Sequence, residues 1–151
     1  MTRYTTMVTA ESSGASEVNM MELLPPASRS IALVRIKVTK SGTSVADGPN
    51  EIRVLRTSNN GVGGIAGTIV KRKPYAPAAV TSVTIKNASN SYTVGVIADT
   101  VARFTYNIRG AFEWIARDDR DKIWSGVNQN LCIALNASDT QNYDVQVDFE
   151  E

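Results

Sequence analysis

The residue types that most often carry catalysis are scarce in this chain of 151 residues. The sequence contains no histidine, and its single cysteine is Cys132. A Ser-His-Asp or Cys-His arrangement requires a histidine, and a zinc site built from histidine and cysteine requires several such ligands, so neither is available. One cysteine also excludes a disulfide within the chain. The composition therefore favours a binding or structural role over an enzymatic one, and we expect no cofactor and no metal ion.

Two other segments invite a chemical interpretation. The densest charge cluster is the segment 117–122, which holds three aspartates, two arginines and one lysine. Carboxylates bind calcium, but this spacing matches no calcium-binding loop, and the neighbouring cations oppose one, which favours a solvated turn. The segment Gly61-Val62-Gly63-Gly64 lacks the Lys-Ser/Thr of a phosphate-binding loop and is expected between strands, which favours a flexible connection.

The basic run Lys71-Arg72-Lys73 could contact nucleic acid or an acidic protein surface. Three cations without interleaved aromatic residues are too few for strong phosphate binding. Sixteen basic and fifteen acidic residues leave a formal charge of +1, whereas nucleic acid and membrane surfaces demand a clear positive excess. We therefore expect neither a nucleic acid nor a membrane as the partner. A solvated strand end is the alternative interpretation of this run.

Alternating apolar and polar side chains predict eight or nine short strands, which would have to position any such site. In the stretch 31–39 we expect Ala32, Val34, Ile36 and Val38 on one face, and the stretch 143–151 alternates most cleanly. Residues 18–24 fit a helical turn or an edge strand, and 80–86 with 92–96 fit a hairpin. The expected strands are 31–39, 51–56, 65–70, 80–86, 92–96, 102–109, 112–117, 130–135 and 143–151.

This pattern predicts an all-β, antiparallel two-sheet sandwich that is jelly-roll-like, with a small barrel as the alternative. Residues 1–15 are rich in hydroxyl side chains and are expected to form an extended N-terminal arm, and residues 16–151 a single β-sandwich domain. Cys132 is expected to be buried. Candidate partner-binding residues are Thr2, Arg3 and Tyr4 of the arm, the basic Lys71, Arg72 and Lys73, and the aromatic Tyr92, Phe112, Trp114 and Trp124.

Several stretches in order resemble a loose family of small all-β bacteriophage virion proteins. The resemblance covers about residues 23–151, and none of its patterns is a catalytic signature. The basic run Lys71-Arg72-Lys73 departs from the more neutral or acidic segment expected at that place. The resembling stretches are Leu23-Leu24-Pro25-Pro26-Ala27-Ser28 with the strand 31–39, Val54–Gly64, Phe112-Glu113-Trp114-Ile115-Ala116, Leu131–Leu135 and Val145–Glu151.

The resemblance implies a capsid decoration, or cement, protein that binds assembled subunits of the major capsid protein and stabilises the shell. It also implies a homotrimer and a location on the capsid surface of the virion, after synthesis in the host cytoplasm. In this interpretation the arm orders on the shell, and the aromatic candidates supply buried area at a three-fold interface.

Two other classes of function remain open. A tail or receptor-binding β module of a virion would bind glycan, with exposed Trp or Tyr side chains in a shallow groove. An enzyme that uses carboxylate or Ser-Lys chemistry needs no histidine, but no spacing in the sequence points to one.

Overall fold

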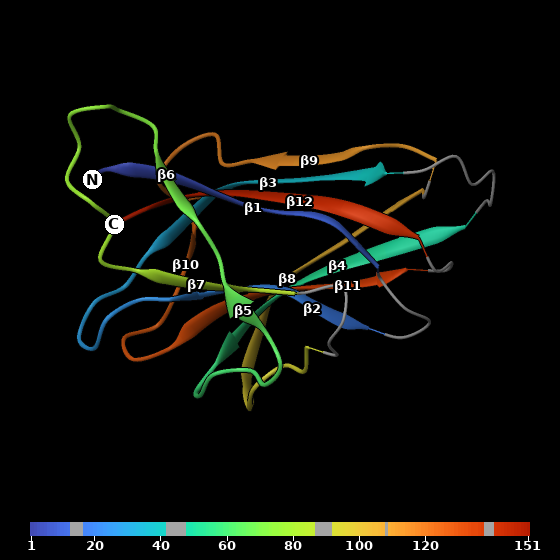
Figure 1. Cartoon of the computed structure of the whole chain (residues 1–151), viewed down its shortest axis with the longest axis horizontal. Coiled ribbons are helices and arrows are strands. Elements are labelled where there is room, and N and C mark those ends of the chain that lie inside the picture. The colour runs from blue at the N-terminus through green and yellow to red at the C-terminus, as the bar shows by residue number, and fades with distance from the viewer. Residues whose placement is uncertain (13–16, 42–47, 87–91, 108, 138–140) are drawn as a thin grey trace.

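Two antiparallel sheets packed face to face form the protein, as the computed structural model shows (Figure 1). The structure describes residues 1–12, 17–41, 48–86, 92–107, 109–137 and 141–151, and all regular secondary structure in them is β-strand. The described residues include no helix with the length and apolar character needed to cross a membrane. The predicted all-β, two-sheet sandwich is therefore confirmed.

In the described part of the chain each sheet contains six strands, and every pairing between these strands is antiparallel. In sheet A the order is β10 (Ile123–Trp124), β3 (Ala32–Ser41), β12 (Asn142–Glu150), β1 (Arg3–Ser12) and β6 (Ile69–Lys71), and β9 (Phe112–Ile115) also pairs with β3. In sheet B the order is β5 (Ile65–Ala66), β7 (Ser82–Ile85), β2 (Val18–Leu24), β11 (Asn130–Ala137), β4 (Pro49–Thr57) and β8 (Ile97–Asn107).

The chain winds between the sheets in the manner of a jelly roll. Strands β1, β2, β3 and β4 alternate between sheet A and sheet B, β8 lies beside β4, and the path then alternates again through β9, β11 and β12. The resulting orders, β1-β12-β3-β9 and β2-β11-β4-β8, are those of the two four-stranded sheets of a jelly roll. Residues 58–96 are inserted between β4 and β8, and they add β6 beyond β1 and both β5 and β7 beyond β2.

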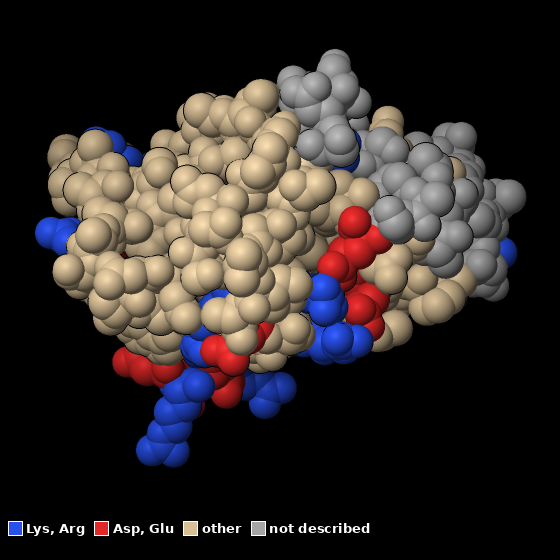
Figure 2. Space-filling model, turned by 90° about the horizontal axis from the view of Figure 1, so that it is seen from below, with Lys and Arg blue, Asp and Glu red and all other residues tan. Residues whose placement is uncertain are grey.

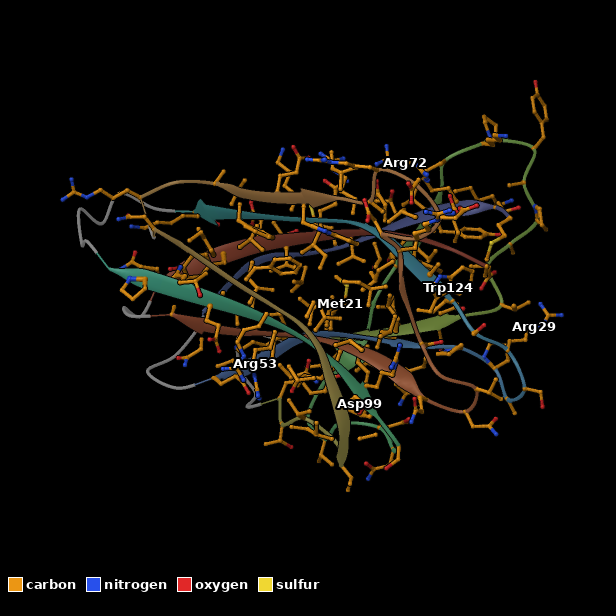
Figure 3. The ribbon with its side chains drawn as sticks, turned by 180° about the vertical axis from the view of Figure 1, so that it is seen from behind. Met21, Arg29, Arg53, Arg72, Asp99 and Trp124 are labelled. Carbon is orange, nitrogen blue, oxygen red and sulfur yellow. The ribbon has the colours of Figure 1, made fainter. Side chains whose placement is uncertain are left out.

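The core lies between the inner faces of the sheets and is built from the alternation seen in the sequence. Tyr143, Val145, Val147 and Phe149 of β12 are all buried, as one-sided burial of an antiparallel sheet requires. Figure 3 shows Met21 between the two sheets. The predicted burial of the Cys132 side chain, which is in a smaller cluster with Leu55 and Ala134, is also confirmed.

The N-terminal residues correct one expectation. Residues 3–12 do not form an arm apart from the domain, because they form β1, which pairs with β12 on one side and β6 on the other. Tyr4 and Val8 are buried, and the buried hydroxyl of Thr6 donates to the carbonyl oxygen of Thr68 at 2.9 Å. Residues 13–16 of the predicted arm lie outside the described residues. The sandwich domain therefore begins at β1 rather than at residue 16.

Two details of strand pairing also differ from expectation. The predicted hairpin is wrong, because β7 pairs with β2 and β5, whereas Thr93 in the segment 92–96 forms an isolated bridge with Val62. In β3 the register shifts opposite residues 148 and 149 of β12. Such a bulge reverses the alternation, so Leu33 joins the core in place of Val34. Residues 18–24 form a strand inside sheet B, not at its edge.

Candidate interaction surface

Three of the predicted partner-binding residues meet on the outer side of sheet A. Arg3, Arg72 and Lys73 line a hollow of about 630 Å³, although Arg3 and Arg72 are far apart in the sequence. They meet because β1 and β6 are neighbouring strands. Figure 3 shows Arg72 on the outer side of sheet A. The hollow is also lined by Met1, Val34, Arg35, Glu113, Ile115, Ala116, Asp148 and Glu150.

The floor of the hollow carries a row of ion pairs that crosses sheet A. Asp148 on β12 is buried at its centre, and its Oδ2 accepts a hydrogen bond from Nη2 of Arg72 at 2.5 Å. The same oxygen lies 3.8 Å from Nη1 of Arg35 on β3, and Arg35 donates through Nε to Glu113 on β9 at 2.6 Å. The hydroxyl of Thr5 donates to the other Asp148 oxygen at 2.6 Å. Opposite charges on adjacent strands stabilise the sheet through such cross-strand pairs.

A second row of ion pairs centres on Glu150. Its Oε1 accepts from Nη2 of Arg3 at 2.9 Å, and its Oε2 accepts from Nζ of Lys122 at 2.7 Å. Burial alone raises the pKa of Glu150, but the hydrogen bonds from Lys122 and Arg3 outweigh burial and place the pKa below its ordinary value. Hydrogen bonds to Asp119 and Glu150 raise the pKa of Lys122. The row therefore stays charged at neutral pH.

The predicted residues of the first four positions have different roles. Thr2 forms backbone hydrogen bonds with Glu151 in both directions, at 3.0 and 3.2 Å. Tyr4 is 1% exposed and stacks on Phe149 with ring centroids 5.6 Å apart. Arg3 is the only one of the three that is exposed. A partner in contact with this fold can therefore reach Arg3 but not the ring of Tyr4.

Two of the predicted aromatic residues lie between the edge strands of the two sheets. Phe112 and Trp114 of β9 pack on Phe104 of β8 with centroid distances of 5.2 and 5.9 Å, and Phe112 packs on Tyr106 at 5.5 Å. All four rings are partly buried. Burial raises the pKa of Tyr106 to about 12. We call this group the aromatic seam, and it lies apart from the hollow on sheet A.

The other two predicted aromatic residues are also separate. Trp124 in β10 is partly buried, and its carbonyl oxygen accepts a hydrogen bond from Nε of Arg56 at 2.9 Å. Tyr92 is 2% exposed and lies on the outer side of sheet B, beneath the Gly-rich loop. The structure therefore brings Arg3, Arg72 and Lys73 together but does not join them to Tyr92, Trp124 or the seam.

A buried polar cluster around Glu22 was not predicted from the sequence. The Glu22 side chain is 0% exposed, and its carboxylate accepts four hydrogen bonds. Oε1 accepts from the Thr57 hydroxyl at 3.0 Å and Nδ2 of Asn130 at 3.2 Å, and Oε2 accepts from the Gly61 N–H at 2.8 Å and the Tyr92 hydroxyl at 2.9 Å. The signal in the sequence was a lone glutamate inside the apolar run 18–24.

The Glu22 cluster fixes the Gly-rich loop on sheet B. A Cβ on Gly61 would lie 2.4 Å from the carbonyl oxygen of Thr93 and 2.7 Å from the Tyr92 ring, so only glycine fits there. Burial, followed by the charge of Glu22, raises the pKa of Tyr92 above its ordinary value. Burial also raises the pKa of the Cys132 thiol, which donates to Asn19 at 3.0 Å and therefore remains protonated.

Away from Lys71-Arg72-Lys73, the inserted residues 58–96, which supply β5 and β7 of sheet B, carry little charge. Figure 2, which views the molecule from the side of sheet B, shows one group of charged side chains along an edge and another group of both signs nearer the middle of the face, with much of the remaining described surface uncharged. The sequence has no charged residue between Arg56 and Lys71, and only Lys86 between Lys73 and Asp99. On β4 and β8 of sheet B, by contrast, ion pairs join Arg53 to Glu17, Arg103 to Glu51 and Arg56 to Asp99.

The charged segment near residue 120 forms a turn in which the aspartates 118 and 119 have partners within the chain. Asp118 accepts from the N–H of Arg120 at 2.7 Å, and Asp119 pairs with Lys122 at 2.5 Å, in agreement with a mixed-charge turn. Among the residues that the structure describes, no group of three or more His, Cys, Asp or Glu side chains is arranged to hold a metal ion.

Comparisons of the chain with protein-family models, with curated proteins and with solved structures found no match.

Proposed function

We propose that this protein is a bacteriophage capsid decoration protein that binds assembled subunits of the major capsid protein and stabilises the shell. The observation that carries the proposal is the meeting of Arg3, Arg72 and Lys73 around one hollow on a rigid jelly roll. Jelly-roll sandwiches serve in viral capsids and in lectins, so the fold is compatible with this role without specifying it. The order of sequence stretches that resemble phage virion proteins supplies the rest.

In this proposal the protein acts by binding alone. The sheet A hollow presents four cations and three carboxylates, and rows of ion pairs hold all of them except Lys73 in place before a partner arrives. Groups that are already ordered lose little entropy on binding. Many copies on a symmetric shell add avidity, so a single contact of modest affinity is sufficient.

We also propose a homotrimer at the capsid surface, with the partly buried aromatic seam as its contact. Phe112 and Trp114 leave part of their area exposed at the edge of the sandwich, and aromatic residues are enriched in interfaces. Light scattering of the purified protein measures its mass directly. A monomer at micromolar concentration contradicts this part of the proposal and leaves shell binding to be tested by itself.

Co-sedimentation with assembled shells tests the main proposal. The purified protein is mixed with shells of the major capsid protein, and with unassembled coat subunits as the control. We expect saturable binding to shells and a higher temperature of shell disassembly. A protein that stays in the supernatant at all shell concentrations contradicts the proposed function.

The alternative is a receptor-binding module of a virion that binds glycan. One observation favours it: Tyr75 is 99% exposed, and an exposed aromatic face can stack on a sugar ring. The two tryptophans are less suited to that role because both are partly buried. Binding to a glycan array without binding to shells would favour this alternative over decoration.

A further inference from the structure

A loop that joins the two sheets carries the most exposed aromatic side chain described. Residues 72–81 connect β6 in sheet A with β7 in sheet B, and the loop extends beyond the end of the sandwich beside both termini (Figure 1). We call it the bridging loop. Its Tyr75 is 99% exposed, whereas Tyr4, Tyr92 and Tyr143 are 0–2% exposed. A fully exposed tyrosine buries a large area only when a partner covers it.

The base of the bridging loop is anchored to sheet A on one side. The N–H of Arg72 donates to the carbonyl oxygen of Arg3 at 3.1 Å, and the Arg72 guanidinium pairs with the buried Asp148. The hydroxyl of the buried Tyr4 donates to the carbonyl oxygen of Pro77 at 3.2 Å. The buried Tyr4 therefore anchors the bridging loop and does not contact a partner directly.

The returning half of the loop is anchored by Glu151. Its carboxylate accepts from the N–H of Val80 at 2.7 Å, from the N–H of Thr81 at 2.9 Å and from the Thr81 hydroxyl at 2.5 Å. At the tip, the N–H of Ala76 donates to the carbonyl oxygen of Lys73 at 3.0 Å, which closes a turn around Tyr75. Prolines at 74 and 77 restrict the backbone on both sides of the ring. The tip is therefore preorganised.

The basic residues nearest to Tyr75 in the sequence are Lys71, Arg72 and Lys73. Lys71 and Lys73 are exposed, and neither forms an ion pair with a carboxylate of the described residues. Arg72, in contrast, is occupied by Asp148. The loop thus presents one large ring, and the ammonium groups of Lys71 and Lys73, which form no such pair, precede it closely in the sequence. This combination fits an acidic protein surface with a pocket for the ring.

We propose that the bridging loop is the docking element of this protein. Tyr75 inserts into a pocket on the coat subunit, and Lys71 and Lys73 pair with carboxylates at the rim of that pocket. This inference rests on the proposed function and names the contact through which the shell is bound. A single-stranded nucleic acid is a poorer fit, because such sites use successive aromatic residues and a longer basic groove.

Titration of variants onto assembled shells tests the contact. We expect Tyr75→Ala to weaken shell binding about 30-fold, as for an interface hot spot of about 2 kcal/mol. The double variant Lys71→Glu and Lys73→Glu is expected to weaken binding at least as much by opposing the acidic rim. Val62→Ser, which changes a side chain that is 72% exposed on the Gly-rich loop, serves as the control and is expected to bind as wild type does.

Nitration with tetranitromethane supplies a second readout that needs no variant. Free protein is expected to be modified first at Tyr75, and shell-bound protein to be protected there. If the wild-type protein binds shells, the Tyr75→Ala variant binds them equally well and Tyr75 is not protected from nitration, the inference is overturned and the proposed function is left intact. No wild-type binding to shells overturns both, and binding that single-stranded DNA displaces completely assigns the loop to nucleic acid instead.

Discussion

Replacing Tyr92 with phenylalanine tests how firmly the buried Glu22 carboxylate holds the Gly-rich loop on sheet B. The Tyr92 hydroxyl donates to Oε2 of Glu22 at 2.9 Å in a site without solvent access. A hydrogen bond to a charged group contributes about 1.5–3 kcal/mol. Tyr92→Phe removes that bond but keeps the ring, so we expect the free energy of unfolding to fall by about 2 kcal/mol.

Glu22→Gln is the stronger perturbation although it preserves the size of the side chain. If the new NH₂ group takes the Oε2 position it faces the Gly61 N–H, and in the Oε1 position it faces Nδ2 of Asn130. Either orientation sets two donors against each other. An unsatisfied buried donor costs about 1–3 kcal/mol, and the charge-assisted bonds are lost as well, so we expect a loss of about 3–4 kcal/mol.

Urea denaturation followed by circular dichroism measures these losses in the two single variants and the double variant. Because Tyr92 acts through Glu22, we expect the double variant to lose less than the sum of the two. Glu113→Gln is the matched control, since this exposed glutamate pairs with Arg35 on the surface and its loss is expected to stay below about 1 kcal/mol. A Glu22→Gln variant within about 0.5 kcal/mol of wild type would refute the reasoning.

Three further outcomes are expected. Gly61→Ala places a Cβ 2.4 Å from the carbonyl oxygen of Thr93 and is expected to lower the free energy of unfolding by about 1–3 kcal/mol, whereas Gly110→Ala meets nothing closer than 3.6 Å; equal melting temperatures for the two variants would contradict this. Deletion of residues 1–12 removes a strand paired on both sides, so the truncated chain is expected to show no cooperative thermal transition, and a wild-type transition would restore the arm interpretation. Burial raises the pKa of Tyr106 from 10.0 to about 12, so its stabilising contribution is complete below pH 10 and is lost as the pH rises from 10 toward 12. Tyr106→Phe is therefore expected to reduce the loss of stability over this alkaline range. An unchanged loss would contradict the assignment.

The fold was predictable where burial on one face imposes a period of two on the sequence. Strand β12 shows this, because its inward positions are all large and apolar. Strand β1 escaped recognition because an inward position holds Thr6, whose hydroxyl is satisfied by the carbonyl oxygen of Thr68. A polar side chain with a buried partner breaks the pattern in the sequence while preserving it in the structure. The partner lies 62 residues away and cannot be inferred locally.

Alternation also does not reveal which strands pair. Residues 80–86 have the pattern of a strand, and turn residues follow them, but β7 pairs with β2 and β5 instead of with the next segment. A single bulge in β3 was enough to exchange the facing of Leu33 and Val34. Register depends on contacts between distant strands, so these features could not be obtained from local sequence.

Only part of the candidate site was predictable from the sequence, because the rest depends on which strands are neighbours. The basic run at 71–73 is visible as composition, but its meeting with Arg3 depends on β1 lying beside β6. Tyr75 was not singled out because tyrosine occurs in cores as well as on surfaces. Of the other tyrosines, Tyr4, Tyr92 and Tyr143 are buried and Tyr106 is partly buried. Exposure of one ring among five tyrosines is a property of topology rather than of residue type.

The near-zero net charge has a different meaning once the pairs on sheet A are known. Arg3, Arg35 and Arg72 are each paired with a carboxylate of β12, so they contribute to the sheet more than to any field beyond it. Lys73 at the hollow and Lys71 on β6 form no ion pair with a carboxylate of the described residues. Two ammonium groups can orient a partner but supply little affinity by themselves when solvent and salt screen them. If the bridging loop binds the shell, most of the affinity must therefore come from burial of the Tyr75 ring.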